Sequence, residues 1–91
     1  MTEHDRNCVA ALSQLFPELS QAEQKVAILN CVLGMTTQDI AIERGVGVKT
    51  IETNFKRAKE KLECNSLQEL RSVVVLRIMA RNLMLNQMPL T

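Results

Sequence analysis

Four times along this chain, a serine or threonine is followed three residues later by an acidic residue and then by apolar residues at helical spacing. A hydroxyl and a carboxylate at this spacing bond the free backbone N–H groups at the start of a helix, which makes the pattern a capping box. The pairs begin at Thr2, Ser20, Thr36 and Ser66. No alternating strand pattern competes with them, so we expect an all-α fold.

Five helices are predicted, because a further apolar stripe follows Gly47. Pro17 ends the first helix, and glycines end the second and third. The expected spans are 3–16, 20–33, 36–44, 48–63 and 66–86. Helical spacing predicts these inward side chains: Cys8, Val9, Leu12, Leu15 and Phe16; Ala22, Val26, Leu29 and Leu33; Ile40 and Ala41; Val48, Ile51, Phe55, Ala58 and Leu62.

The composition argues against several classes of protein. No run of about 18 uncharged apolar residues is present, so we expect no membrane span. The polar, charged start is unlike a secretory signal, which favours the cytoplasm. The three cysteines lack metal-ligand spacing and are interpreted as small core hydrophobes, with no metal or cofactor expected. His4 is the only histidine, and no nucleophile–base pair is visible, so we do not expect an enzyme.

The segment from Ala41 to Ile51 has the pattern of a helix-turn-helix. Ala41 is small enough for two helices to approach closely, and Gly45 can adopt the left-handed backbone of a tight turn. Val46 is apolar, and we expect it to fill the space between the two helices. Any tight corner between helices can show this pattern. The residues alone therefore leave two interpretations open, a DNA-binding helix-turn-helix and an ordinary corner between two helices.

The distribution of charge favours the DNA-binding interpretation. Residues 1–42 carry two basic and five acidic residues, a net −3, whereas residues 49–61 carry five basic and two acidic residues, a net +3. The whole chain has a net charge of only +1. Such a concentration is typical of an element that contacts phosphates. The alternative is a solvated helix face with pairs such as Glu52–Lys56, which would not explain the concentration.

The stretch GMTTQDIAIERGVGVKTIETNFKRAKEKLECNSLQEL resembles the DNA-binding domain of LuxR-type regulators, which include the NarL/FixJ response regulators. The preceding LSQAEQKVAIL looks like that family's opening motif. The resemblance implies a bacterial regulator of transcription with a four-helix domain, in which residues 48–63 form the recognition helix. In this chain, an additional N-terminal helix would precede that domain, and the fourth helix of the domain would be a long C-terminal helix.

The resemblance also implies roles for individual residues. Base contacts are expected from Glu52, Thr53 and Lys56. Phosphate contacts are expected from Thr37, Lys49, Thr50, Asn54, Arg57 and Lys59. Lysine can donate to guanine, threonine can offer a methyl group to thymine, and glutamate can accept from cytosine N4. The implied partner is double-stranded DNA.

Two further interpretations remain open. The spacing from Leu19 to Gly34 is one residue longer than is usual in LuxR-type domains and matches the fourth region of bacterial sigma factors. A chain similar to that region would contact promoter DNA and RNA polymerase. The third interpretation is a helix-turn-helix that binds a protein instead of DNA. Such a chain would act as an adaptor or anti-activator, and its partner would be another regulator.

The chain continues past Leu62 with a capped helix from Ser66, which favours the LuxR-type interpretation over a sigma region ending near Leu62. This last predicted helix is apolar on two faces. One face carries Leu67, Leu70, Val74, Ile78 and Leu85, and the other carries Val73, Leu76, Met79 and Leu83. A second copy of the helix would cover the free face and make a homodimer. The expected interface is Leu70, Val73, Val74, Arg77, Ile78 and Arg81.

The N-terminal helix could instead fold back and cover this face within one chain.

With only 91 residues, the chain is predicted to form a single domain over residues 1–91. Its parts would be an N-terminal helix extension at 1–17, a helix-turn-helix core at 19–64 and a dimerisation helix at 65–88.

Overall fold

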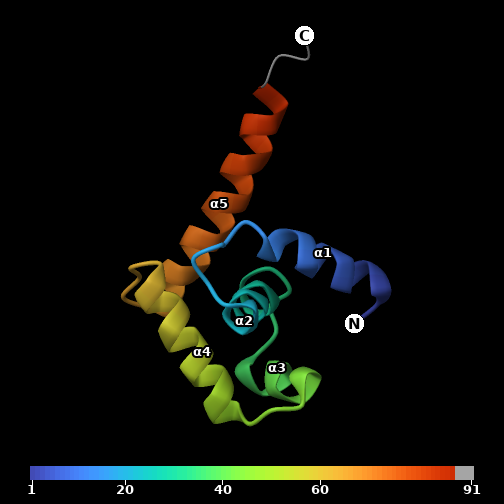
Figure 1. The fold of residues 1–91 in the computed structure, drawn as a ribbon, viewed down its shortest axis with the longest axis vertical. Coiled ribbons are helices and arrows are strands. Elements are labelled where there is room, and N and C mark those ends of the chain that lie inside the picture. The colour runs from blue at the N-terminus through green and yellow to red at the C-terminus, as the bar shows by residue number, and fades with distance from the viewer. Residues whose placement is uncertain (88–91) are drawn as a thin grey trace.

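The computed structural model of the protein describes the backbone of residues 1–87 and the side chains of residues 1–84. Within these residues it contains five α-helices and no strand, as Figure 1 shows. The predicted all-α class is therefore confirmed, together with the order of the helices. They are α1 (Glu3–Ser13), α2 (Gln21–Cys31), α3 (Thr37–Arg44), α4 (Val48–Lys61) and α5 (Leu67–Gln87).

The capping boxes that begin α1, α2 and α3 are formed as predicted, with both reciprocal hydrogen bonds present. At α5 the Glu69 N–H donates to Ser66 Oγ over 3.1 Å, but the Glu69 carboxylate accepts from the Asn65 N–H over 2.7 Å. The carboxylate therefore bonds one residue earlier than the prediction required. The hydroxyl–carboxylate spacing located the helix start correctly even where the second bond shifted.

Three helices end earlier than predicted, and the second of them, α2, ends at Cys31 rather than residue 33. α1 ends at Ser13 rather than residue 16, because Leu15 and Phe16 donate to carbonyls only three residues back and tighten the chain before Pro17. α4 ends at Lys61, and Glu63 then takes a left-handed φ of 59°. This conformation lets the Cys64 N–H bond the Lys59 carbonyl over 2.7 Å and closes the helix end.

α2 is the centre of the domain and packs against each of the other four helices. Five consecutive residues, 26–30, are buried, although the sequence predicted a stripe on one face. Because four helices pack against α2, its burial does not follow a single stripe, although Gln21 and Lys25 remain exposed. The core is formed by residues of all five helices and of the segment between α1 and α2: Val9, Phe16, Leu19, Val26, Ala27, Ile28, Leu29, Ile40, Ala41, Ile51, Phe55, Ala58, Leu70 and Val74.

Several residues predicted to face inward lie at the surface. Cys8 is exposed and Cys31 and Cys64 are half-buried, so the core interpretation of Cys8 is wrong. Leu33 follows the end of α2 and is exposed, and Val48 at the start of α4 is also exposed. Leu33 and Val48 occupy helix ends, where the neighbouring helices no longer cover the chain, whereas Cys8 lies in the middle of α1 on its exposed side.

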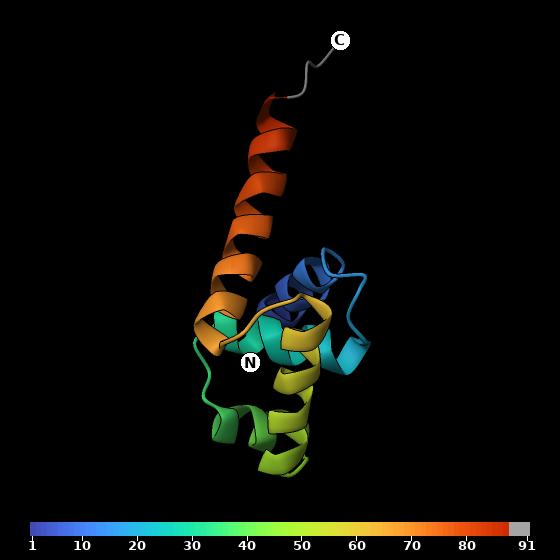
Figure 2. The same cartoon turned by 90° about the vertical axis from the view of Figure 1, so that its left-hand side faces the viewer.

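α5 begins in the core and then extends away from the other four helices in both views (Figures 1 and 2). Leu70 and Val74 are fully buried, whereas Leu76, Met79 and Leu83 are 64%, 55% and 54% exposed. α1 does not cover this second apolar face, so the fold-back alternative is wrong for these residues. The prediction for Leu85 lies outside the described side chains, and residue 88 lies outside the described backbone.

Arg77 attaches the segment after α1 to α5. Its guanidinium donates to the Leu15 carbonyl over 3.1 Å and to Glu18 Oε1 over 2.8 Å, and lies 4.9 Å from the centre of the Phe16 ring. The hydrogen bond from Arg77 lowers the pKa of Glu18. The sequence analysis assigned Arg77 to a dimer interface, but the side chain bonds within its own chain.

Candidate nucleic-acid interface

α3 and α4 are joined by the three residues Gly45, Val46 and Gly47. Gly45 has a φ of +67°, as predicted, and its N–H bonds back to the Ala41 and Ile42 carbonyls. The Val46 N–H also bonds the Ala41 carbonyl, over 3.0 Å. Ala41 is buried at the crossing of the helices, but Val46 is 40% exposed, so its predicted role as a plug is wrong. A tight turn with a buried small residue before it is the geometry of a helix-turn-helix.

α4 has a buried face and a basic outer face. Ile51, Phe55 and Ala58 lie in the core. The exposed residues on the outer face are Lys49, Thr50, Glu52, Lys56 and Arg57, with Thr53 and Lys59 half-buried. Thr37 is half-buried at the start of α3. The fold thus places most of the predicted contact residues where a ligand can reach them.

One of the predicted contacts needs correction, and the chemistry that another can offer is narrowed. Asn54 is only 8% exposed and lies on the buried side of α4, which removes it from the phosphate contacts. The Thr53 hydroxyl donates to the Lys49 carbonyl over 3.0 Å. That bond occupies its proton, leaving the methyl group and the oxygen lone pairs for a ligand.

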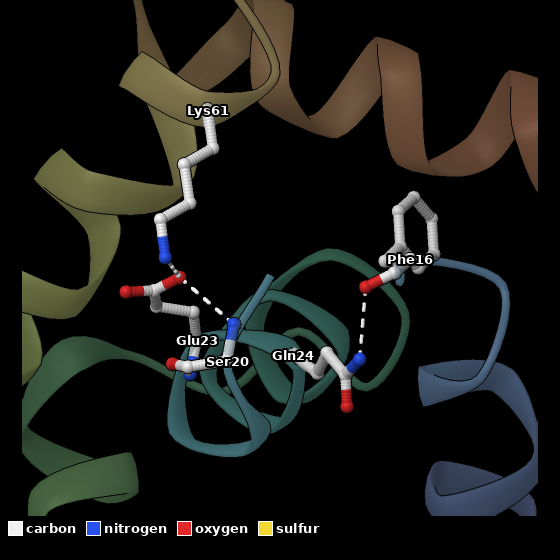
Figure 3. Close-up of polar contacts among 5 residues, drawn as sticks. All are labelled: Phe16, Ser20, Glu23, Gln24 and Lys61. Atoms are coloured by element: carbon white, nitrogen blue, oxygen red, sulfur yellow. Dashed lines mark hydrogen bonds and ion pairs between the residues drawn. The ribbon is translucent and has the colours of Figure 1, made fainter. Parts of the chain in front are cut away.

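The Lys61 side chain is 43% exposed, but its amine bonds a residue of α2 and is not part of the outer face. Its Nζ donates to Glu23 Oε1 over 2.7 Å, and Figure 3 shows this oxygen also facing the Ser20 backbone N–H. Burial alone would raise the pKa of Glu23, but the hydrogen bonds from Lys61 and the Ser20 backbone outweigh it and leave the pKa lowered. A capping residue of α2 therefore also fixes the C-terminal end of α4. This bond was not predicted from the sequence. The excess of basic residues on α4 was the available signal, because a basic residue in excess on one helix can pair with an acid on another.

Lys61 being paired, four basic residues remain on α4, namely Lys49, Lys56, Arg57 and Lys59. Within residues 1–84 the two ion pairs are Lys61–Glu23 and Arg77–Glu18. The Glu52–Lys56 pair that the alternative interpretation required is therefore absent from the described side chains. Unpaired cations on an exposed helix face produce a positive potential there, which attracts a polyanion.

Other kinds of site find little support in the described residues. No group of three or more His, Cys, Asp or Glu side chains comes together among residues 1–84. Burial raises the pKa of the Cys31 thiol to about 11, which keeps it protonated and unreactive. No helix within residues 1–87 is sufficiently long and apolar to cross a bilayer.

Residues 10–62 match the family described as Sigma-70, region 4, which is more than half of the 91 residues. The chain belongs to the Sigma-70 region 4 family. Curated proteins and solved structures give no match. The family is a DNA-binding helix-turn-helix family connected with transcription and is not an enzymatic one.

The family assignment changes the interpretation of the last helix. The match begins within α1 and ends directly after α4, so α5 lies outside it. The sequence analysis used this helix to prefer a LuxR-type domain. The broad helix-turn-helix class is supported, but the matched family is the sigma alternative. The longer spacing from Leu19 to Gly34 was the better indicator, because it lies inside the shared domain.

Proposed function

We propose that the protein reads duplex DNA in a sequence-specific manner, with α4 in the major groove, and regulates transcription. The observation that carries this proposal is the division of α4 into an anchored face and a basic outer face. Ile51, Phe55 and the Lys61–Glu23 ion pair fix the helix against α2. Fixing the helix matters because base contacts depend on the position of a few side chains.

Three side chains on the outer face are suited to bases. Lys56 can donate to guanine O6 and N7, Glu52 can accept from cytosine N4, and Thr53 can place its methyl group against thymine. Around them, Thr37, Lys49, Thr50, Arg57 and Lys59 are proposed to contact phosphates. Binding of this kind weakens steeply as salt rises, because each neutralised phosphate releases counterions.

The direct test is an in vitro selection from random duplex DNA with the purified protein at moderate salt. We expect an enriched sequence, and we expect the enrichment to be lost when Glu52 and Lys56 are both changed to alanine. Circular dichroism of the double variant controls for folding, since both side chains are exposed. Failure of the unmodified protein to enrich any sequence would overturn the proposal and favour a protein-binding adaptor.

We further propose that the protein acts as a homodimer through a seam on α5 formed by Leu76, Met79 and Leu83. Their spacing of three and then four residues is the repeat of a coiled coil. At 100° per residue the seam lies opposite Leu70 and Val74, which the core already covers. Arg81 also lies away from the seam, so pairing two copies would not bring like charges together. The predicted interface is thereby revised, because Leu70 and Val74 have no free surface.

The dimer is tested by sedimentation velocity over a range of concentrations. Leu76→Glu should give a monomer at concentrations where the unmodified chain is dimeric. Arg81→Glu, which introduces the same side chain on the other side of the helix, should remain dimeric. If Arg81→Glu also dissociates the dimer, the originally predicted face forms the interface. If the unmodified chain is monomeric at all concentrations, the homodimer is wrong. A dimer would set two recognition helices about 34 Å apart on a pseudo-palindromic site.

A second candidate is favoured by the family match. A module of Sigma-70 region 4 type would contact promoter DNA as a single copy while bound to RNA polymerase. The two candidates predict different enriched sites in the in vitro selection from random duplex DNA. A two-fold symmetric site favours the dimer, whereas a single half-site bound by a monomer favours the promoter-contacting module.

A further inference from the structure

A hollow of about 340 Å³ lies between α1, α2 and α3, apart from the proposed DNA-binding face. Val9 and Leu29, two residues of the core, line it. Figure 1 places α1 and α4 on opposite sides of α2. A duplex docked along the outer face of α4 therefore has α2 between itself and α1.

Three cations line this hollow, and each comes from a different helix. Arg6 belongs to α1, Lys25 to α2 and Arg44 to α3, while Glu43 is the single acid in the lining. Neither of the two ion pairs formed within residues 1–84 involves any of these four side chains. The first 42 residues carry more acids than bases, so an unneutralised cluster of cations here is not a consequence of overall charge.

We propose that this hollow binds an acidic peptide segment of a partner protein. An apolar side chain of the segment would lie against Met1 and Ala10, which line the hollow and are exposed, since Val9 and Leu29 are only 6% and 2% exposed. Carboxylates on either side of it would pair with Arg6, Lys25 and Arg44. Cations distributed over three helices around apolar side chains suit carboxylates spaced along a chain better than one small anion. Sequestering an apolar side chain beside them also lowers the local dielectric and strengthens each pairing.

The site fits a role beside DNA binding, because its residues are separate from those proposed to contact DNA. A partner held there would leave the outer face of α4 free. The protein would then join an acidic segment and a DNA duplex on opposite sides of α2. This inference is independent of the dimer, since none of its residues lies on α5.

The test is a titration of the full ¹⁵N-labelled chain, followed by NMR, with the blocked peptide acetyl-Asp-Glu-Leu-Asp-Glu-amide. We expect shifts of the backbone amides of Arg6, Lys25 and Arg44, with no shift of Lys56. The matched peptide acetyl-Asn-Gln-Leu-Asn-Gln-amide should bind about tenfold more weakly or not at all. Equal binding of the two peptides, or shifts centred on α4, would overturn the proposal.

Variants of the chain test the charges directly. Lys25→Gln with Arg44→Gln should weaken the acidic peptide about tenfold, the size expected for two partly exposed ion pairs. The charge-keeping pair Lys25→Arg with Arg44→Lys should retain most of the affinity. Glu43→Gln should strengthen binding, because it removes the one repulsive carboxylate. Unchanged affinity in the first variant, with its circular dichroism also unchanged, would contradict the assignment.

Two further titrations separate other anions from the peptide. If inorganic phosphate at the same concentration shifts the same amides as strongly, the hollow is a simple anion site and the proposal is wrong. If a short duplex shifts these amides as strongly as those of α4, they contact DNA phosphates, and the proposal is again wrong. We expect neither shift at the hollow.

Discussion

The two faces of α5 have the same kinds of residue and opposite surroundings. Leu70 and Val74 on one face are fully buried, whereas Leu76 and Leu83 on the opposite face are more than half exposed. α2 and α4 pack against the buried face, and the helix then extends away from the other helices (Figure 2). An apolar pattern therefore specifies that a face will be covered, but not whether the chain itself covers it.

The largest expected effect comes from comparing two leucines of α5. Leu70→Ala removes a fully buried side chain and should lower the free energy of unfolding by about 2–5 kcal/mol. Leu76→Ala should change it by no more than about 0.5 kcal/mol when the protein is dilute and monomeric. Urea denaturation measures both. Equal losses of unfolding free energy would show that the face of α5 that carries Leu76 is covered within a single chain.

Lysines of α4 extend the comparison to function. Lys56→Ala should weaken binding to the selected DNA by about 1–3 kcal/mol and relax the preference at one base pair. Lys61→Ala should leave the base preference unchanged, because its amine bonds Glu23. Fluorescence anisotropy with single-base variants of the site measures both effects. Equal weakening by Lys56→Ala on every DNA sequence would instead identify Lys56 as a phosphate contact.

The two ion pairs allow a third comparison, between a buried carboxylate, Glu23, and a partly exposed one, Glu18. Glu23→Gln should lower the free energy of unfolding by about 1–2 kcal/mol, because it removes a charged partner from a buried capping box. Glu18→Gln should cost less than about 1 kcal/mol, since the Glu18–Arg77 pair is partly exposed. Thermal denaturation of both variants at pH 7 provides the ranking. A larger loss for Glu18→Gln would mean that the bridge to Arg77 is the stronger of the two.

The same two carboxylates predict a dependence on pH. Their pKa values are lowered in the folded protein, so the unfolded chain binds protons more readily than the folded chain. Their stabilisation is complete above the ordinary glutamate pKa of about 4.3 and is lost as pH falls through the lowered folded values. Glu23→Gln should therefore lose less stability than the unmodified chain between pH 6 and pH 3. Parallel stability curves over this range would show that Glu23 does not contribute to the acid sensitivity.

The smallest expected effect is the change in stability when glycine replaces Glu60 or Glu63, and its sign should differ between the two positions. Glu63 has a φ of 59°, a conformation that costs a residue with a Cβ about 1 kcal/mol, so Glu63→Gly should stabilise the protein by roughly this amount. Glu60 is exposed within the last turn of α4, and Glu60→Gly should destabilise it by about 1 kcal/mol. Urea denaturation of the two variants distinguishes these signs. Destabilisation by Glu63→Gly would mean that the Glu63 side chain has a stabilising contact that outweighs its backbone conformation.

Much of the candidate site could be predicted because it depends on local chemistry. The left-handed Gly45 and the outward position of Lys56 follow from residues a few positions apart. Asn54 was misplaced because its burial depends on how closely α4 approaches the rest of the core. The bond of Lys61 was not predicted, because its partner, Glu23, lies 38 residues away in the chain.

The sequence by itself determined where four of the helices begin, because a hydroxyl and a carboxylate three residues apart act on backbone within one turn. It also determined that α4 is amphipathic and basic, since charge and spacing are read directly from the residues. Only the tertiary structure decided that five consecutive residues of α2 are buried and that the apolar face of α5 is left bare. It also decided which lysine of α4 bonds inward. These properties depend on helices distant in the chain, and no local pattern specifies how far one helix extends past another.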